Sequence, residues 1–182
     1  MTTILKCIAL CLIALFWAWP ADSESEAAAA LQALISSAER LLVGVAREMP
    51  QEKYDFVPTA GEFRGVRTFA RQLKHAAAVQ YLVAASILGE PVNADMVEER
   101  GPDAVRTKAQ VLEYVEGSFA ALHRAAATVD NGNAFASIKG VFGSAPTTRT
   151  GLIAGALAHS SNHYGQIVEY LRMNGIVPPA SR

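Results

Sequence analysis

Residues 149–175 read RTGLIAGALAHSSNHYGQIVEYLRMNG, and this stretch decides the fold that we expect for the chain. Its length and apolar pattern predict one helix over residues 149–174. A glycine and, shortly after it, two prolines follow, which is a common stop signal for a helix. Because residues four apart lie one turn apart on the same helical face, His159 and His163 can present two imidazole nitrogens to one ion.

Three earlier stretches also carry apolar residues at helical spacing. The first stops at Pro50, since proline disfavours α conformation in the residue before it. The second stops at Gly89, and the third runs into a turn signal at Asn131. With the last stretch, these four segments predict an all-α domain, a four-helix bundle over residues 27–179. The three earlier helices are expected at residues 27–48, 68–88 and 103–128.

A third histidine, His75, lies about two turns inside the second predicted helix. In a bundle, ligand and metal sites are built from side chains on facing helices. If His75 joins His159 and His163, the site has three neutral ligands and keeps positions open for water or substrate, as catalytic centres do. We therefore expect a metal site formed by His75, His159 and His163.

The first residues resemble a signal for export. Lys6 closes a short positive region, and an apolar run too short to span a bilayer comfortably extends to about Trp19. We expect a signal peptide over residues 1–23, with an approximate cleavage site, and a periplasmic or secreted protein that leaves the membrane after cleavage. The alternative is a retained N-terminal membrane anchor. Cys7 and Cys11 both lie in this segment, so the mature chain has no thiol and must use nitrogen or oxygen ligands.

Composition and motifs exclude several functions. The chain has 182 residues, of which 51% are hydrophobic, and its net charge is −1, so it is suited to one core and has no basic field for nucleic acid. A zinc protease of the HExxH type needs Glu directly after its first histidine, where this chain has Ser160. No glycine-rich phosphate loop is recognisable either.

Two glutamines are candidates for supporting the histidines. Gln166 follows His163 by three residues and Gln72 precedes His75 by three, so each lies near the face of its helix that carries a histidine. Ligand histidines usually need a partner for their second nitrogen, and an amide side chain can supply it. His123, in the third predicted helix, is expected to be a surface residue or to lie near a helix end, where a cation is favourable, without a role in the site.

The segment AHSSNHYGQIVEYLRMNGIVPP, residues 158–179, resembles the end of the DinB-like proteins, a family of metal-binding four-helix bundles. The segments KYDFVPT (53–59) and RTFARQLKH (67–75) resemble the family's approach to its first ligand helix. The resemblance implies that His75 is the first metal ligand and that His159 and His163 are the pair from the last helix. It also implies a homodimer.

Members of this family with an assigned activity are metal-dependent transferases or isomerases that use a low-molecular-weight thiol such as bacillithiol or mycothiol. The resemblance therefore implies a thiol-handling transferase whose substrate and catalytic residues are unknown. Two alternatives stay open: a metal-dependent hydrolase that uses a metal-bound hydroxide, and an exported protein that binds a metal or small ligand without turnover. The cofactor is expected to be a divalent ion, with zinc, nickel, iron and manganese all compatible with such a site.

Overall fold

The computed structural model describes residues 25–182 except residues 142 and 144, so the predicted signal peptide lies outside the described residues. Four long helices form a bundle, as the sequence predicts. They are α2 (Glu26–Glu48), α3 (Phe69–Leu88), α5 (Lys108–Ala127) and α6 (Arg149–Met173).

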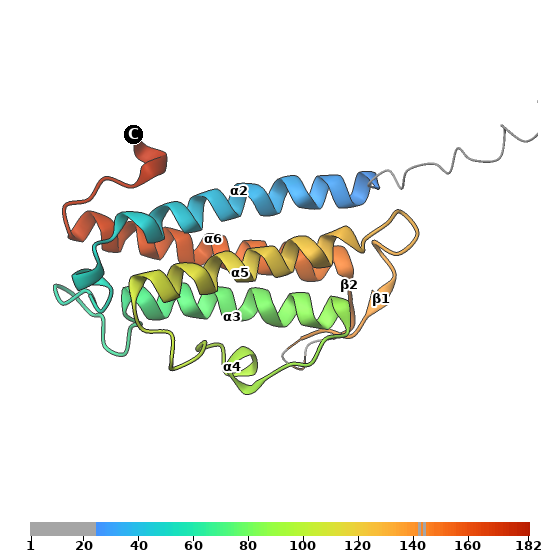
Figure 1. Ribbon diagram of the computed structural model, residues 1–182, viewed down its shortest axis with the longest axis horizontal. Coiled ribbons are helices and arrows are strands. Elements are labelled where there is room, and N and C mark those ends of the chain that lie inside the picture. The colour runs from blue at the N-terminus through green and yellow to red at the C-terminus, as the bar shows by residue number, and fades with distance from the viewer. Residues whose placement is uncertain (1–24, 142, 144) are drawn as a thin grey trace, which may run out of the picture.

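The helices do not simply alternate in direction. Figure 1 shows that α3 and α5 run in one direction and that α2 and α6 run in the opposite one. α3 packs against α5 and α6, and α2 packs against the same two helices. Because α3 and α5 are parallel, the chain between them must return along the length of the bundle, and this crossover includes the short helix α4 (Ala94–Val97).

Each long helix begins at a residue whose side chain accepts a hydrogen bond from a free backbone amide of the first turn. Ser25, Thr68, Thr107 and Thr148 do so for α2, α3, α5 and α6. At Thr107 the pairing is reciprocal, because the Gln110 side chain accepts from the backbone amide of Thr107.

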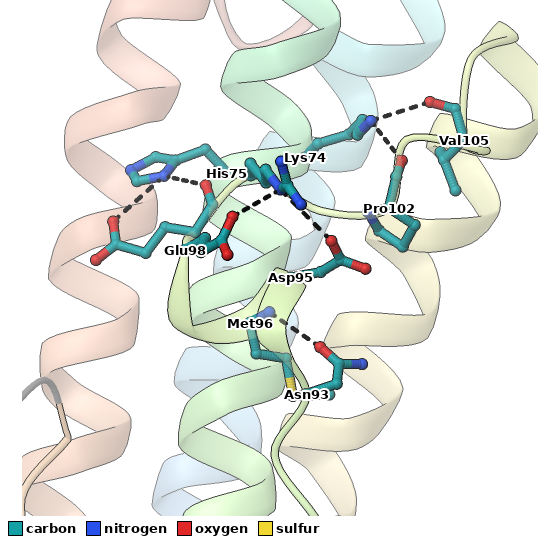
Figure 2. A network of polar contacts seen from close by, with 10 residues as sticks. Lys74, His75, Asn93, Asp95, Met96, Glu98, Pro102 and Val105 are labelled. Atoms are coloured by element: carbon teal, nitrogen blue, oxygen red, sulfur yellow. Dashed lines mark hydrogen bonds and ion pairs between the residues drawn. The ribbon is translucent and has the colours of Figure 1, made fainter.

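The prediction that the third helix starts at residue 103 is wrong, since α5 starts at Lys108. The Lys74 ammonium binds two backbone carbonyls in the segment that precedes α5. It donates to Pro102 O at 2.6 Å and to Val105 O at 3.1 Å. Figure 2 shows these two contacts. The carbonyl of Val105 is therefore bound to a side chain, and the helix begins only after the Thr107 cap.

The connection between α5 and α6 contains a short pairing that the sequence did not indicate. Strand β1 (Ser137–Ile138) pairs antiparallel with β2 (Thr147–Thr148). Two-residue strands have no alternating pattern long enough to be recognised in a sequence. Other short elements are the 3₁₀ turns η1 (Gln51–Lys53) and η2 (Pro179–Ser181).

The core consists of aliphatic and aromatic side chains from all four long helices. α2 has the length and apolar composition of a helix that could cross a membrane, but the core helices of soluble proteins share these features. One side of α2 is buried in the bundle, through residues that include Leu31, Ile35, Leu42 and Val45, while Leu34 is 57% exposed on the other side.

Candidate metal centre

The three histidines come together between α3 and α6. Nε2 of His159 lies 3.1 Å from Nε2 of His75 and 3.1 Å from Nε2 of His163. One nitrogen from each ring lies within 4.8 Å of the other two. His75 and His163 are buried, with exposed fractions of 4% and 7%, and His159 is half-buried.

Helix geometry explains this convergence. His159 and His163 are one turn apart on α6, so both rings project from the same face. α3 runs antiparallel beside α6, and His75 lies where the two helices face each other. Hydrogen bonds between α3 and α6 on both sides of His75 hold the two helices in this alignment. Gln72, before His75, donates to Gln166 Oε1, and the buried Gln80, after His75, donates to Ser160 Oγ at 2.8 Å.

Hydrogen bonds set the tautomer of two of the rings. His75 Nδ1 lies 2.7 Å from the carbonyl oxygen of Glu99, which can only accept, so Nδ1 carries the proton. His163 Nδ1 lies 2.7 Å from Gln72 Oε1, and the amide nitrogen of Gln72 donates to Gln166 Oε1. His163 therefore also donates from Nδ1, and both rings direct an unprotonated Nε2 at His159.

This donor set fits a divalent metal ion. Two imidazole nitrogens held about 2.0–2.1 Å from one ion in a tetrahedral site lie roughly 3.3 Å apart, close to the spacing found here. Without a cation or a shared proton, the described residues offer one donor, His159 Nε2, to the two lone pairs of His75 and His163. His159 Nδ1 is buried and has no hydrogen-bond partner among the described residues, so this ring is the least tightly oriented of the three.

The surroundings keep the rings neutral, which is the form that binds metal. Burial lowers the pKa of His163 to about 3 and that of His159 to about 4, with neighbouring histidines and Arg67 acting in the same direction. Burial also lowers the pKa of His75, although its hydrogen bond to the Glu99 carbonyl acts the other way.

The two predicted glutamines lie beside the histidines in unequal roles. Gln72 is 1% exposed and contacts His163 directly. Gln166 contacts Gln72 and donates to Asn162 Oδ1 at 2.7 Å, so it reaches His163 only through Gln72.

His123 lies apart from this cluster, on α5. Its ring contacts Gln32 and lies 3.3 Å from Glu39 Oε2 on the neighbouring helix α2. It is only partly exposed, because these two side chains cover it.

Glu99 is the residue of the site that the sequence did not reveal. Its carbonyl orients His75, and its carboxylate Oε2 lies 3.4 Å from His75 Nδ1. Among the described residues it is the one non-glycine residue with a positive φ, at 53°. Such a backbone conformation costs about 1–2 kcal/mol and is kept where the surrounding structure requires it. A lone glutamate in a crossover has no periodicity or motif that would single it out.

A pocket of about 340 Å³ opens beside the histidines. His159 and Glu99 line it at the end nearest the histidine cluster, and the rest of its lining is small or aliphatic. A small molecule in this pocket therefore reaches the cluster at the His159 ring.

The family model of the DinB superfamily matches residues 18–167. This range contains the three histidines and both glutamines, and it begins inside the predicted signal peptide. No curated protein matches the chain. The family match covers most of the sequence and agrees with the helical bundle, so the chain belongs to the DinB superfamily.

Proposed function

We propose that the protein is a divalent-metal-dependent transferase of the thiol-handling type, with His75, His159 and His163 as the metal ligands. The observation that carries this proposal is the convergence of three imidazole Nε2 atoms, two of them with their lone pairs fixed toward the centre. Membership of the DinB superfamily supports the thiol chemistry, because that is the chemistry the resemblance implies.

When bound, a divalent ion would supply a positive charge that lowers the pKa of a thiol or a water molecule. The chain's own residues prepare the place for it. The Glu99 carbonyl and Gln72 fix two of the rings, which reduces the rearrangement needed on binding.

The transfer itself requires a thiol and an electrophile. The sulfur forms a bond to the electrophilic carbon, the leaving group departs with its bonding electron pair, and the thiol proton passes to solvent. An apolar substrate group that fills the aliphatic pocket beside His159 would displace water from that side of the site, which favours transfer to sulfur over hydrolysis.

A hydrolase is the second candidate, and the position of Glu99 favours it. A carboxylate between the pocket and His75 is placed to bind a water molecule that attacks a substrate in the pocket. This alternative predicts cleavage of esters or amides without added thiol.

We also propose that the protein acts outside the cytoplasm as a homodimer. Export rests on the apolar run that ends near Trp19, and the dimer rests on the family resemblance.

The first test is elemental analysis of protein purified without a metal-binding tag, beside His163→Ala and His123→Ala. We expect near-stoichiometric divalent metal in the wild type and in His123→Ala, and its loss in His163→Ala. His123 is the matched control because it is a histidine of the same bundle outside the cluster. Metal missing from all three proteins after reconstitution would refute the site.

The second test separates the reactions. The metal-loaded protein is incubated with an activated aryl halide, with and without a low-molecular-weight thiol, and separately with aryl esters. Consumption of the halide only with thiol supports the transferase, and ester cleavage without thiol supports the hydrolase. Metal binding without either reaction would leave a metal-binding protein without turnover.

A further inference from the structure

The pocket beside His159 is formed by the helical faces that also carry the histidines. On α3, Val79 and Val83 follow His75 at one and two turns. On α6, Ala156 and Leu152 precede His159 at about one and two turns. Because α3 and α6 are antiparallel, these four residues lie on the same side of the metal centre, toward the end of the bundle where α6 begins.

The walls of the pocket are apolar along its whole length. Val79, Val83, Leu152 and Ala156 are each less than a tenth exposed, which leaves their side chains to face the pocket or the core. Among the described residues, Glu99 is the one charged residue in the lining, and it lies at the end nearest the histidines. A negatively charged group entering this pocket would lose its hydration and meet the Glu99 carboxylate, so the lining selects against anions.

The volume indicates the size of ligand. The pocket measures about 340 Å³, roughly twice an engineered cavity of about 150 Å³ in another protein that takes up benzene. It also lies in the range of about 300–1,000 Å³ that is usual for small-molecule sites. One aromatic ring with a short substituent, or a branched aliphatic chain of similar size, would fill it.

We propose that this pocket binds an uncharged aromatic or branched aliphatic group of the substrate and directs its reactive end toward His159. The proposal rests on the proposed function, because it names the class of electrophile that the transferase accepts. Anionic and strongly hydrated electrophiles are poor substrates, and the apolar walls set this preference.

Gly155 provides a way to close the pocket without touching a histidine. It lies one turn before His159 in the pocket lining, and a Cβ added there meets no atom of the described residues within 4 Å. We expect a leucine at this position to narrow the pocket, since its side chain starts from open space at the pocket wall, and leucine favours the helix more than glycine does. Gly165, also on α6, is the matched control, since an added Cβ there also meets no atom in the described part of the chain within 4 Å and the residue is not part of the lining.

The pocket is tested first without thiol, by NMR titration of the ¹⁵N-labelled protein with toluene. We expect the amide signals of Val79, Val83 and Leu152 to shift, with toluene affinity falling at least tenfold in Gly155→Leu and less than twofold in Gly165→Leu. Shifts confined to other parts of the bundle, or equal affinities in the two variants, would overturn the proposal.

A second measurement connects the pocket to the metal centre. In the cobalt(II)-loaded protein, binding of phenylmethanethiol and of 2-mercaptoethanol is followed by the sulfur-to-cobalt absorption band. Phenylmethanethiol carries a benzyl group on its sulfur, as the thioether product of a benzyl electrophile does, so it reports whether the pocket binds that group beside the metal. We expect phenylmethanethiol to bind at least tenfold more tightly, and this preference to disappear in Gly155→Leu but not in Gly165→Leu. Equal binding of both thiols to the wild type would refute the pocket proposal and leave the thiol chemistry intact. If neither thiol gives the band, the proposed function fails, and the toluene titration still decides whether the pocket binds apolar groups.

Discussion

The hydrogen bond between Gln72 and His163 gives the sharpest prediction about the metal centre. Replacing Gln72 by Met keeps a side chain of similar length but removes the acceptor that lies 2.7 Å from His163 Nδ1. Gln72 is 1% exposed, so water cannot readily take its place. The His163 ring then loses the contact that holds its lone pair toward the other two rings.

The expected size of the effect follows from the position of this contact. Removing a partner of a ligand histidine typically lowers metal affinity 10- to 100-fold, which corresponds to about 1.4–2.7 kcal/mol. Gln166→Met is the control, because Gln166 is exposed and contacts His163 only through Gln72. We expect an effect of less than about threefold there, since Gln72 keeps its oxygen on His163.

The assay is a competitive zinc titration against a chromophoric chelator, with circular dichroism to check that both variants keep the helical bundle. Gln72→Glu retains an acceptor at the same place and should recover most of the affinity lost in Gln72→Met. Zinc affinity in Gln72→Met within twofold of the wild type would refute the view that Gln72 orients His163. Equal losses in Gln72→Met and Gln166→Met would show that the two amides act as one unit.

Two further predictions concern the metal-free protein. The folded-state pKa values of His159 and His163 are about 4 and about 3, below the ordinary value of 6.5, so the unfolded chain binds more protons in this range. The free energy of unfolding, measured with urea in the presence of a chelator, should therefore fall as the pH drops from about 6.5 toward 3. The fall should be less steep in His163→Gln, and equal slopes would contradict this. Glu99→Gly should raise the free energy of unfolding of the metal-free protein at pH 7 by about 1 kcal/mol, because glycine adopts the φ of 53° without strain. A loss of stability would mean that the contacts of the Glu99 side chain outweigh the strain of its backbone.

The helices could be predicted because their signals are local. The apolar stripes and the stop signals set α2, α3 and α6 within one or two residues of their observed bounds. The pairing of His159 with His163 follows from the helical repeat, since four residues make about one turn. The start of α5 is not set by local signals alone, because it depends on Lys74, a residue of another helix that binds the carbonyls before Thr107.

The sequence by itself determined an all-α bundle and one helical face with two histidines, because backbone hydrogen bonds and side-chain periodicity within a helix depend only on neighbouring residues. Tertiary structure alone decided which side chains complete the site. His75 meets His159 because α3 and α6 pack antiparallel in one register, and Glu99 reaches His75 because the crossover returns along α3. The pocket beside them exists only between two packed helices. Contacts between segments distant in sequence depend on how the whole core packs, and no local pattern records them.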